Sequence, residues 1–201
     1  MVSRVGAPRP GRTAPGPTAP GLDAGGLDAG GGPALHVAAR AWAVAAAVPD
    51  PELPVLTLAD LGVLRRVELT PSGGLVVSIT PTYTGCPAME AIRDDLRGAL
   101  HQAGYAEVEV RTVLHPAWST DWISAQGRRK LAAAGIAPPG AAPRRPAGAV
   151  PLTLVPAPRR VACPQCGSAD TGERSAFGPT PCTALRRCNA CGEPFQHVKE
   201  I

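Results

Sequence analysis

The stretch Cys163-Pro164-Gln165-Cys166-Gly167, followed further along by Cys188-Asn189-Ala190-Cys191-Gly192, decides the fold of the C-terminal part of the chain. The two residues inside each cysteine pair let both thiolates turn toward one ion. The glycine after each pair permits the positive φ that such a knuckle needs. Two knuckles supply the four sulfur ligands of a tetrahedral structural metal site. The pattern therefore predicts a ribbon over residues 161–201 that depends on metal to fold.

Zinc is the ion that this quartet is predicted to bind. A single rubredoxin-like iron and a cluster are the alternatives, because iron also accepts tetrahedral sulfur. We favour zinc because nothing else in the ribbon indicates electron transfer. Cys182 lies outside the knuckle spacing and has three interpretations: an alternative ligand, a redox thiol or a residue that fills space.

Composition excludes several classes of protein. A formal charge of +4 on 201 residues is too mild for a nucleic-acid-binding surface, so no nucleic-acid partner is expected. Six cysteines with knuckle spacing favour metal binding in a reducing compartment over a disulfide framework. The sequence shows neither a secretory signal nor the run of about 20 apolar residues of a membrane span. We expect a soluble, cytoplasmic protein without a membrane partner.

The 24 prolines and 23 glycines divide the chain, because they concentrate in two stretches. The expected segments are a disordered tail at 1–33, a folded unit at 34–137, a proline-rich linker at 138–160 and the ribbon at 161–201.

Hydrophobic spacing predicts the elements of the folded unit. They are a helix at 35–48, a hairpin of strands at 63–69 and 75–80, a helix at 89–104, a strand at 108–113 and a helix at 120–134. This order is typical of an α+β domain with a mostly antiparallel sheet and helices on one side. The ribbon adds a small β module at the C-terminal end.

Cys86 is the second candidate for chemistry. With Pro87 as first helical residue, Cys86 is predicted at a helix N-cap, where the helix dipole favours a thiolate. Thr82 and Thr84 add hydroxyl donors nearby. Such a cysteine can be a nucleophile, a redox thiol or a ligand of a transferred metal or cluster; it can also simply fill a turn. No nucleophile, base and orienting group occur together, so we expect no catalytic residues and no enzyme.

Other side chains support the site or the core. Asp50 and Glu52 flank a proline and either cap backbone amides, which we favour, or line a pocket near Cys86. Trp118 and Trp122 are expected on one helix face, more for core packing than for partner docking. The remaining charged residues have structural interpretations: Arg128, Arg129 and Lys130 form a solvated helix face unless an acidic partner covers them, and His115 and His197 lack a partner at ligand spacing.

The segments 50–55 (Asp-Pro-Glu-Leu-Pro-Val) and 58–63 (Leu-Ala-Asp-Leu-Gly-Val) resemble the opening motif of the SufT-like family of iron–sulfur assembly factors. The loop 82–87 (Thr-Tyr-Thr-Gly-Cys-Pro) resembles the cysteine loop of that family. Three further features resemble the PaaD branch, whose members are accessory components of ring-1,2-phenylacetyl-CoA epoxidase. They are residues 117–123, the segments 127–131 and 135–139, and the ribbon ending in Glu193-Pro194-Phe195.

This resemblance covers residues 36–139 and 161–199 and implies a function. It implies a maturation factor of the epoxidase in phenylacetate catabolism, which helps to insert iron or an Fe–S cluster and has the oxygenase or reductase components as partners. The family's cysteine falls on Cys86, its acidic motif on Asp50 and Glu52, and its ribbon ligands on the cysteine quartet. The alternative is a structural or electron-relay component of the oxygenase with iron in the ribbon.

Overall fold

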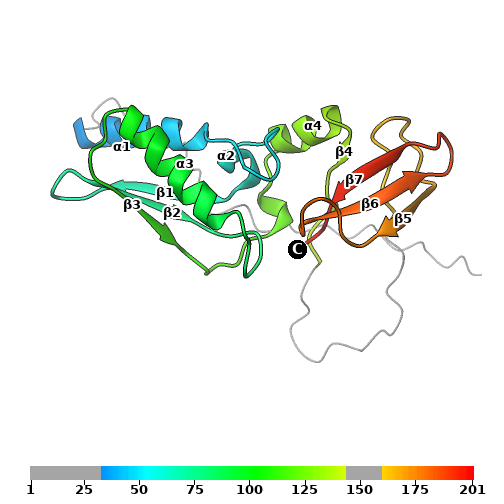
Figure 1. Cartoon of the computed structure of the whole chain (residues 1–201). Coiled ribbons are helices and arrows are strands. Elements are labelled where there is room, and N and C mark those ends of the chain that lie inside the picture. The colour runs from blue at the N-terminus through cyan, green and yellow to red at the C-terminus, as the bar shows by residue number, and fades with distance from the viewer. Residues whose placement is uncertain (1–32, 144–159) are drawn as a thin grey trace, which may run out of the picture.

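The computed structural model describes residues 33–143 and 160–201, which form two lobes (Figure 1). The predicted tail at 1–33, apart from Pro33, and most of the predicted linker lie outside the described residues. The elements of the first lobe are α1 (Pro33–Ala46), α2 (Leu58–Leu61), β1 (Leu64–Leu69), β2 (Leu75–Ile79), α3 (Met89–Gln102), β3 (Val108–Thr112), the 3₁₀ helix η1 (Thr120–Trp122) and α4 (Ala125–Ala133). Those of the second are β4 (Ile136–Ala137), β5 (Thr171–Ser175), β6 (Thr183–Cys188) and β7 (Pro194–Val198).

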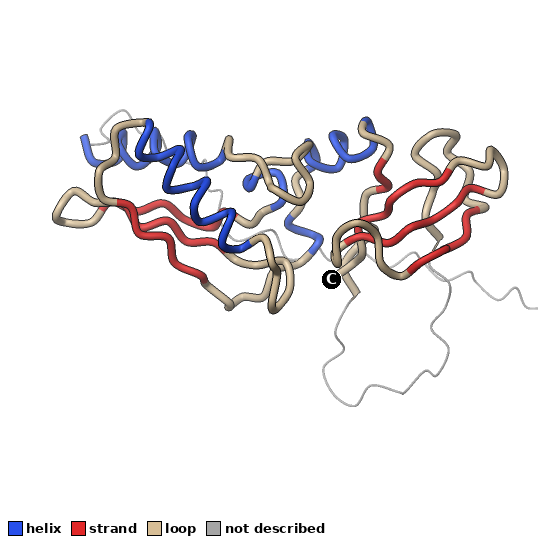
Figure 2. The backbone as a smooth tube through the Cα atoms, viewed as in Figure 1, coloured by secondary structure: helices blue, strands red, loops and turns tan. Residues whose placement is uncertain are grey.

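The first lobe is a three-stranded sheet in the order β1-β2-β3, with α1 and α3 across one face (Figure 2). The apolar spacing of α3 explains its place, because Met89, Ile92, Leu96 and Leu100 are its buried side chains. They pack with the sheet in one core. The predicted α+β class is confirmed.

The sheet is less antiparallel than expected. β1 and β2 form the predicted antiparallel hairpin, but β3 pairs in parallel with β2, from Leu75 opposite Val108 to Ile79 opposite Thr112. The physical reason is the connection: α3 carries the chain back across the sheet, so β2, α3 and β3 form a strand–helix–strand crossover. The expectation of a mostly antiparallel sheet was wrong for this lobe.

The predicted helix at 120–134 is interrupted. Ile123 is extended, and the Ser124 hydroxyl accepts a hydrogen bond from Gly127 N at 2.8 Å, which starts α4 anew. Trp118 and Trp122 therefore do not share a helix face. Trp118 is buried, and its Nε1 donates to the Leu61 carbonyl at 2.9 Å. Trp122 instead lies under the guanidinium of Arg65.

The basic run on α4 is not simply a solvated face. Arg128 donates to the carbonyls of Thr120 and Pro139, and Lys130 forms an ion pair with the buried carboxylate of Asp60 on α2. Only Arg129 is exposed as expected. The other two side chains are tied to the interior by these contacts.

The second lobe is a sheet in the order β4-β7-β6-β5. Its edge strand β4 comes from the chain before the predicted linker and pairs in parallel with β7, with Ile136 opposite Gln196 and Ala137 opposite His197. The boundaries expected from the sequence put Ile136 and Ala137 in the first unit. The ribbon sheet is instead completed by this strand, which directly follows α4.

Further contacts join the lobes. Thr120 N donates to Ile201 O at 3.2 Å, and Gly140 N donates to the Glu200 carboxylate at 3.0 Å. Cys182 and Val198 of the ribbon belong to the same buried apolar cluster as the core of the first lobe. None of the helices in the described ranges has the length and apolar character needed to cross a membrane.

Candidate functional site: a four-cysteine centre and a cavity between the lobes

The four predicted ligands come together at one end of the ribbon. The Sγ atoms of Cys163 and Cys191 are 3.8 Å apart and those of Cys166 and Cys188 are 3.5 Å apart. Metal–sulfur bonds of about 2.3 Å in a tetrahedron place sulfurs about 3.8 Å apart, so the arrangement fits a tetrahedral ion. Within residues 33–143 and 160–201 this is the only group of three or more Cys, His, Asp or Glu side chains at such spacing.

Local backbone geometry builds this centre. Gly167 and Gly192 have φ of +74° and +82°, and their amides donate to the carbonyls of Cys163 and Cys188. The turns close as the sequence predicts, with glycine where a side chain would be strained. Hydrogen bonding from the amide of Cys191 lowers the pKa of Cys188 to about 7, which favours the thiolate that a metal requires.

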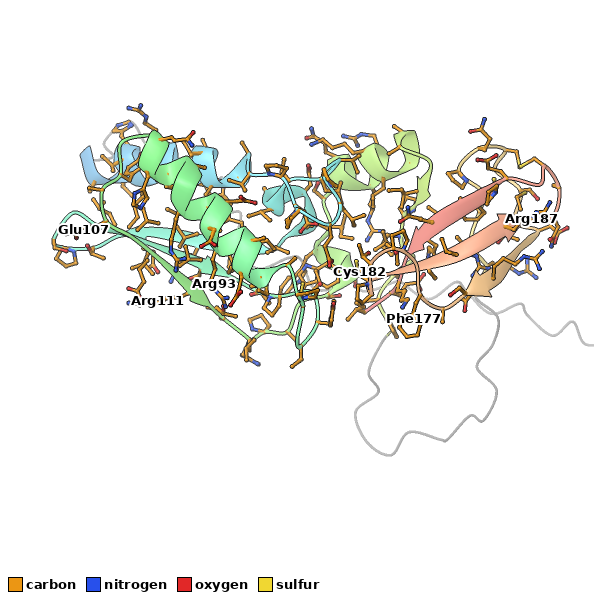
Figure 3. The ribbon with its side chains drawn as sticks, in the orientation of Figure 1. Arg93, Glu107, Arg111, Phe177, Cys182 and Arg187 are labelled. Atoms are coloured by element: carbon orange, nitrogen blue, oxygen red, sulfur yellow. The ribbon has the colours of Figure 1, made fainter. Side chains whose placement is uncertain are left out.

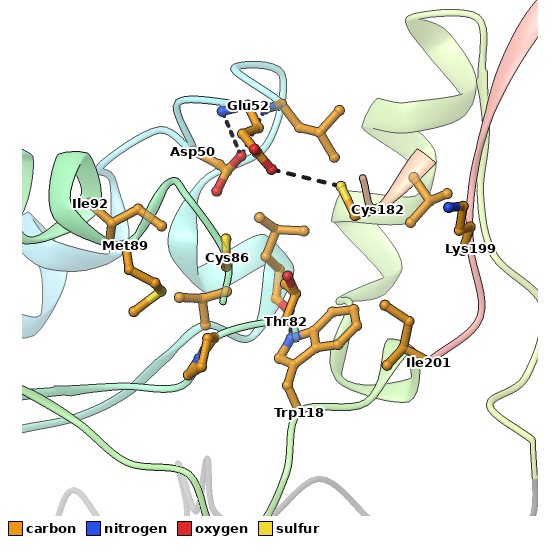
Figure 4. A pocket seen from close by; sticks show the side chains of 15 residues that line it. Asp50, Glu52, Thr82, Cys86, Met89, Ile92, Trp118, Cys182, Lys199 and Ile201 are labelled. Atoms are coloured by element: carbon orange, nitrogen blue, oxygen red, sulfur yellow. Dashed lines mark hydrogen bonds between the residues drawn. The ribbon is translucent and has the colours of Figure 1, made fainter. Parts of the chain in front are cut away.

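A second site lies at the junction of the lobes, where a cavity of about 20 Å³ receives side chains from both (Figure 4). Its polar lining residues are Asp50, Glu52, Thr82 and Cys86 of the first lobe and Cys182 and Lys199 of the ribbon. The structure thus brings together two cysteines that are far apart in sequence.

Cys86 does not occupy the predicted N-cap. α3 begins at Met89 after Ala88, and Cys86 is a half-buried residue of the preceding loop. Burial raises the pKa of its thiol. The Ala88 amide and the Thr82 hydroxyl act the other way, but the nearby Glu52 and Asp50 raise the pKa further and the net shift is upward. The predicted position at a helix N-cap was wrong, and burial together with the two carboxylates favours the thiol over the expected thiolate.

The acidic motif of Asp50 and Glu52 fits both of its predicted roles, backbone capping and lining of a pocket near Cys86. Asp50 is buried, and its Oδ1 accepts from Glu52 N at 3.0 Å and from Leu53 N at 2.7 Å, so it caps the loop. Burial is the main cause that raises the pKa of Asp50. The Asp50 and Glu52 carboxylates also both line the cavity beside Cys86. The two interpretations therefore hold together.

Cys182 is the residue that sequence reasoning could not place. It directly precedes β6, is 8% exposed, and lies at the boundary of the lobes (Figure 3). Its Sγ donates toward Glu52 Oε2 at 3.9 Å and lies 3.1 Å from Thr180 Oγ1. The thiol is not at the cysteine quartet, so it is not an alternative ligand there.

Thr84 departs from its predicted role beside Cys86, and Tyr83 was not among the predicted site residues. Thr84 is exposed and does not line the cavity. Tyr83, which the sequence reasoning missed, has a buried hydroxyl with no hydrogen-bond partner among the described residues. It lies close enough to Cys86, Glu52 and Cys182 to interact with them electrostatically. An aromatic hydroxyl three residues before the loop cysteine was the available signal.

The remaining histidines take no part in either site. His115 is exposed. His197 is buried, and its Nε2 lies 3.5 Å from a carboxylate oxygen of Glu200. The prediction that they are ordinary surface or core residues agrees with these positions.

Two family models match different parts of the chain. Residues 39–112 match an iron–sulfur cluster assembly protein family, and residues 147–199 match the PaaD zinc beta ribbon domain. The first match contains the acidic motif and Cys86, and the second contains the cysteine quartet and Cys182.

Similar proteins carry related names. A protein of Escherichia coli (strain K12) that is named as a component of 1,2-phenylacetyl-CoA epoxidase is 43% identical over 80% of this chain and 91% of its own length. An Fe-S protein maturation auxiliary factor of Porphyromonas gingivalis is 32% identical over 42% of this chain and 80% of its own. A crystal structure of a domain of unknown function, DUF59, from Bacillus anthracis is 28% identical and covers 48% of this chain and 92% of its own, with a TM-score of 0.45.

The identity to the Escherichia coli protein extends over both lobes, and both family models fall on the lobes in the same order as the structure has them. The chain therefore belongs to the PaaD family, which contains this component of 1,2-phenylacetyl-CoA epoxidase.

Proposed function

We propose that this protein is a non-enzymatic maturation factor for the phenylacetyl-CoA ring epoxidase, and that it delivers iron or an iron–sulfur cluster to that enzyme. The observation that carries the proposal is the cavity, where the loop cysteine and the acidic motif of the assembly domain face each other. The names of the relatives support the choice of client and of activity.

In this proposal Cys86 is the transient ligand of the cargo. A half-buried thiol beside two carboxylates has a raised pKa, which favours the protonated form until a metal displaces the proton. This behaviour suits a site that must take up and release a metal cargo. Asp50 fixes the loop, Glu52 contributes an oxygen ligand, and Thr82 orients the sulfur. The epoxidase components would be the partners, in the cytoplasm.

The cysteine quartet holds zinc in this proposal. The sulfur spacing fits a closed tetrahedral site, and such an ion supplies folding free energy and no chemistry. The ribbon then positions β7 and Cys182 against the first lobe.

The test uses the epoxidase components produced together with this chain in a host that lacks its own copy. With Cys86→Ala, we expect oxygenase iron content and epoxidation to fall to the level found without the chain. Zinc content and the melting temperature should be unchanged. Thr84→Ala is the matched control, because it alters the same loop outside the cavity. A fully active oxygenase matured by Cys86→Ala would overturn the proposal.

One observation favours a second candidate, a structural or electron-relay component of the oxygenase. The same sulfur spacing accepts a redox-active iron, which would make the ribbon an electron carrier. Metal analysis of the purified chain tests the electron-relay role, because a coloured, reducible iron centre favours the relay and colourless zinc excludes it.

A further inference from the structure

The thiol of Cys182 lines the cavity between the lobes. It is buried in the seam between the lobes, yet its sulfur meets polar atoms: the Glu52 carboxylate at 3.9 Å and the Thr180 hydroxyl at 3.1 Å. Cys86 lines the same cavity from the other lobe, with Glu52 between the two cysteines (Figure 4). A residue that only filled space at this seam would need no polar surroundings.

The donor set around the cavity selects a class of ion. Two thiols and two carboxylates, from Cys86, Cys182, Asp50 and Glu52, combine soft and hard ligands. This mixture suits a borderline divalent transition metal better than magnesium or calcium, which prefer oxygen alone. Ferrous iron belongs to that class.

The size of the cavity narrows the class further. A volume of about 20 Å³ is room for about one water molecule or one ion. An iron–sulfur cluster has several heavy atoms and is held by four cysteine or histidine ligands, whereas this cavity offers two thiols. The space and the donor count both favour a single ion.

The other polar groups leave the position open to a cation. Lys199 also lines the cavity, but its Nζ donates to the Pro181 carbonyl at 2.8 Å and lies 4.4 Å from the Phe177 ring centroid. The Tyr83 hydroxyl, which has no partner among the described residues, does not itself line the cavity.

We propose that Cys182 is a second thiolate ligand of the cargo and that this cargo is a single ferrous ion held between the two lobes. The inference rests on the proposed function, which it deepens by naming the cargo and the contribution of the ribbon. Binding forms two iron–sulfur bonds, releases one proton from each thiol to solvent and transfers no electron. The four cavity donors do not lie at mutual ligand spacing in this structure, so the inference requires them to move closer together when the ion binds.

The experiment uses the full chain with its quartet filled by one equivalent of zinc, under anaerobic conditions. Cobaltous ion is titrated as a coloured substitute for ferrous ion, and ferrous ion is then bound in competition. The wild type should show the thiolate-to-cobalt absorption of two thiolates per ion. Cys182→Ser and Cys86→Ser should each show half of it, with affinity lower by about 10-fold or more. Pro179→Ala is the matched control, because it changes an exposed residue of the Cys182 loop outside the cavity and keeps the thiol and its contacts.

A measurement on the wild type alone covers the case in which a serine variant fails to fold. Ferrous ion should protect both Cys86 and Cys182 from alkylation, as read by mass spectrometry. Protection of Cys86 alone, or full cobalt absorption in Cys182→Ser, would overturn the inference, as would binding of a sulfide-containing cluster in place of the ion.

The epoxidase maturation assay distinguishes this inference from the proposed function. If Cys182→Ser matures the enzyme normally and Cys86→Ala does not, the second ligand is refuted and the maturation role stands. If neither variant affects maturation, the proposed function fails, whatever the chain binds.

Discussion

Removal of the charge at Asp60 is expected to loosen the contact between α2 and α4, which supports the wall of the cavity. The carboxylate accepts hydrogen bonds from the Thr57 amide and hydroxyl at 3.1 Å, from the Ser124 hydroxyl at 3.2 Å, and from Lys130 Nζ. Asn at this position keeps an oxygen for the Thr57 cap but loses the ion pair. Leu61, the next residue, lines the cavity and holds Trp118.

The magnitude follows from the burial of the pair. Hydrogen bonds between charged groups contribute about 1.5–3 kcal/mol to stability. The Asp60 side chain is 8% exposed and that of Lys130 is 36% exposed, so solvent screens only one partner. We therefore expect Asp60→Asn to lower the free energy of unfolding by about 2 kcal/mol, about a 30-fold change in the unfolding equilibrium.

The effect has a defined pH dependence. Burial alone would raise the pKa of Asp60, but the hydrogen bonds from Lys130 and Thr57 outweigh it, and the pKa lies below its ordinary value. A lowered pKa in the folded state gives stability that is complete above the unfolded pKa of about 4 and is lost as the pH falls through the folded pKa. The advantage of wild type over Asp60→Asn should therefore shrink below about pH 4.

The assay is urea unfolding of the zinc-loaded chain in a double-mutant cycle with Lys130→Met. A coupling free energy of about 1.5–2 kcal/mol at pH 7 is expected. Arg129→Met is the matched control on the same helix, because Arg129 is exposed and has no ion pair to a described residue. Additive effects of the Asp60 and Lys130 substitutions would refute the reasoning.

Two further predictions concern the centre and the wall of the cavity. Chelation of the ribbon metal, or Cys188→Ser, should abolish the β5–β7 structure and the contact of Cys182 with the first lobe. Circular dichroism and a gain in Cys182 alkylation measure this loss. An unchanged spectrum would show that the ribbon folds without metal. Trp118→Phe removes the donor to the buried Leu61 carbonyl and should cost about 1–3 kcal/mol in urea unfolding; a cost below about 0.5 kcal/mol would mean that water replaces the indole.

Local patterns predicted most of the elements correctly. The hairpin needs only β-branched runs and a turn, and α3 needs only its apolar spacing, so both appear within a few residues of the expected bounds. The break at Ser124 was missed because hydrophobic spacing continues across it. The deciding signal was a serine three residues before Gly127, because a serine hydroxyl that accepts from the amide three residues on is typical of an N-cap.

The two sites differ in how far sequence could define them. The cysteine quartet is encoded by spacing within short turns, and its geometry follows from the motif. The cavity is not local: Glu52 and Cys182 are separated by most of the chain and meet only because β4 and β7 dock the ribbon. Single-sequence patterns contain no information about such a contact. Burial also raises the pKa of Cys86, which a helix-dipole argument could not foresee.

The parallel pairing of β4 with β7 has a consequence for engineering. A ribbon cut from this chain at the linker would leave behind its edge strand, and β7 would present unpaired amides and carbonyls to any strand in solution. The two units therefore cannot be exchanged between proteins as separate cassettes. A working chimaera must carry the junction from α4 through β4 together with the ribbon, and its cleanest fusion point lies upstream of η1.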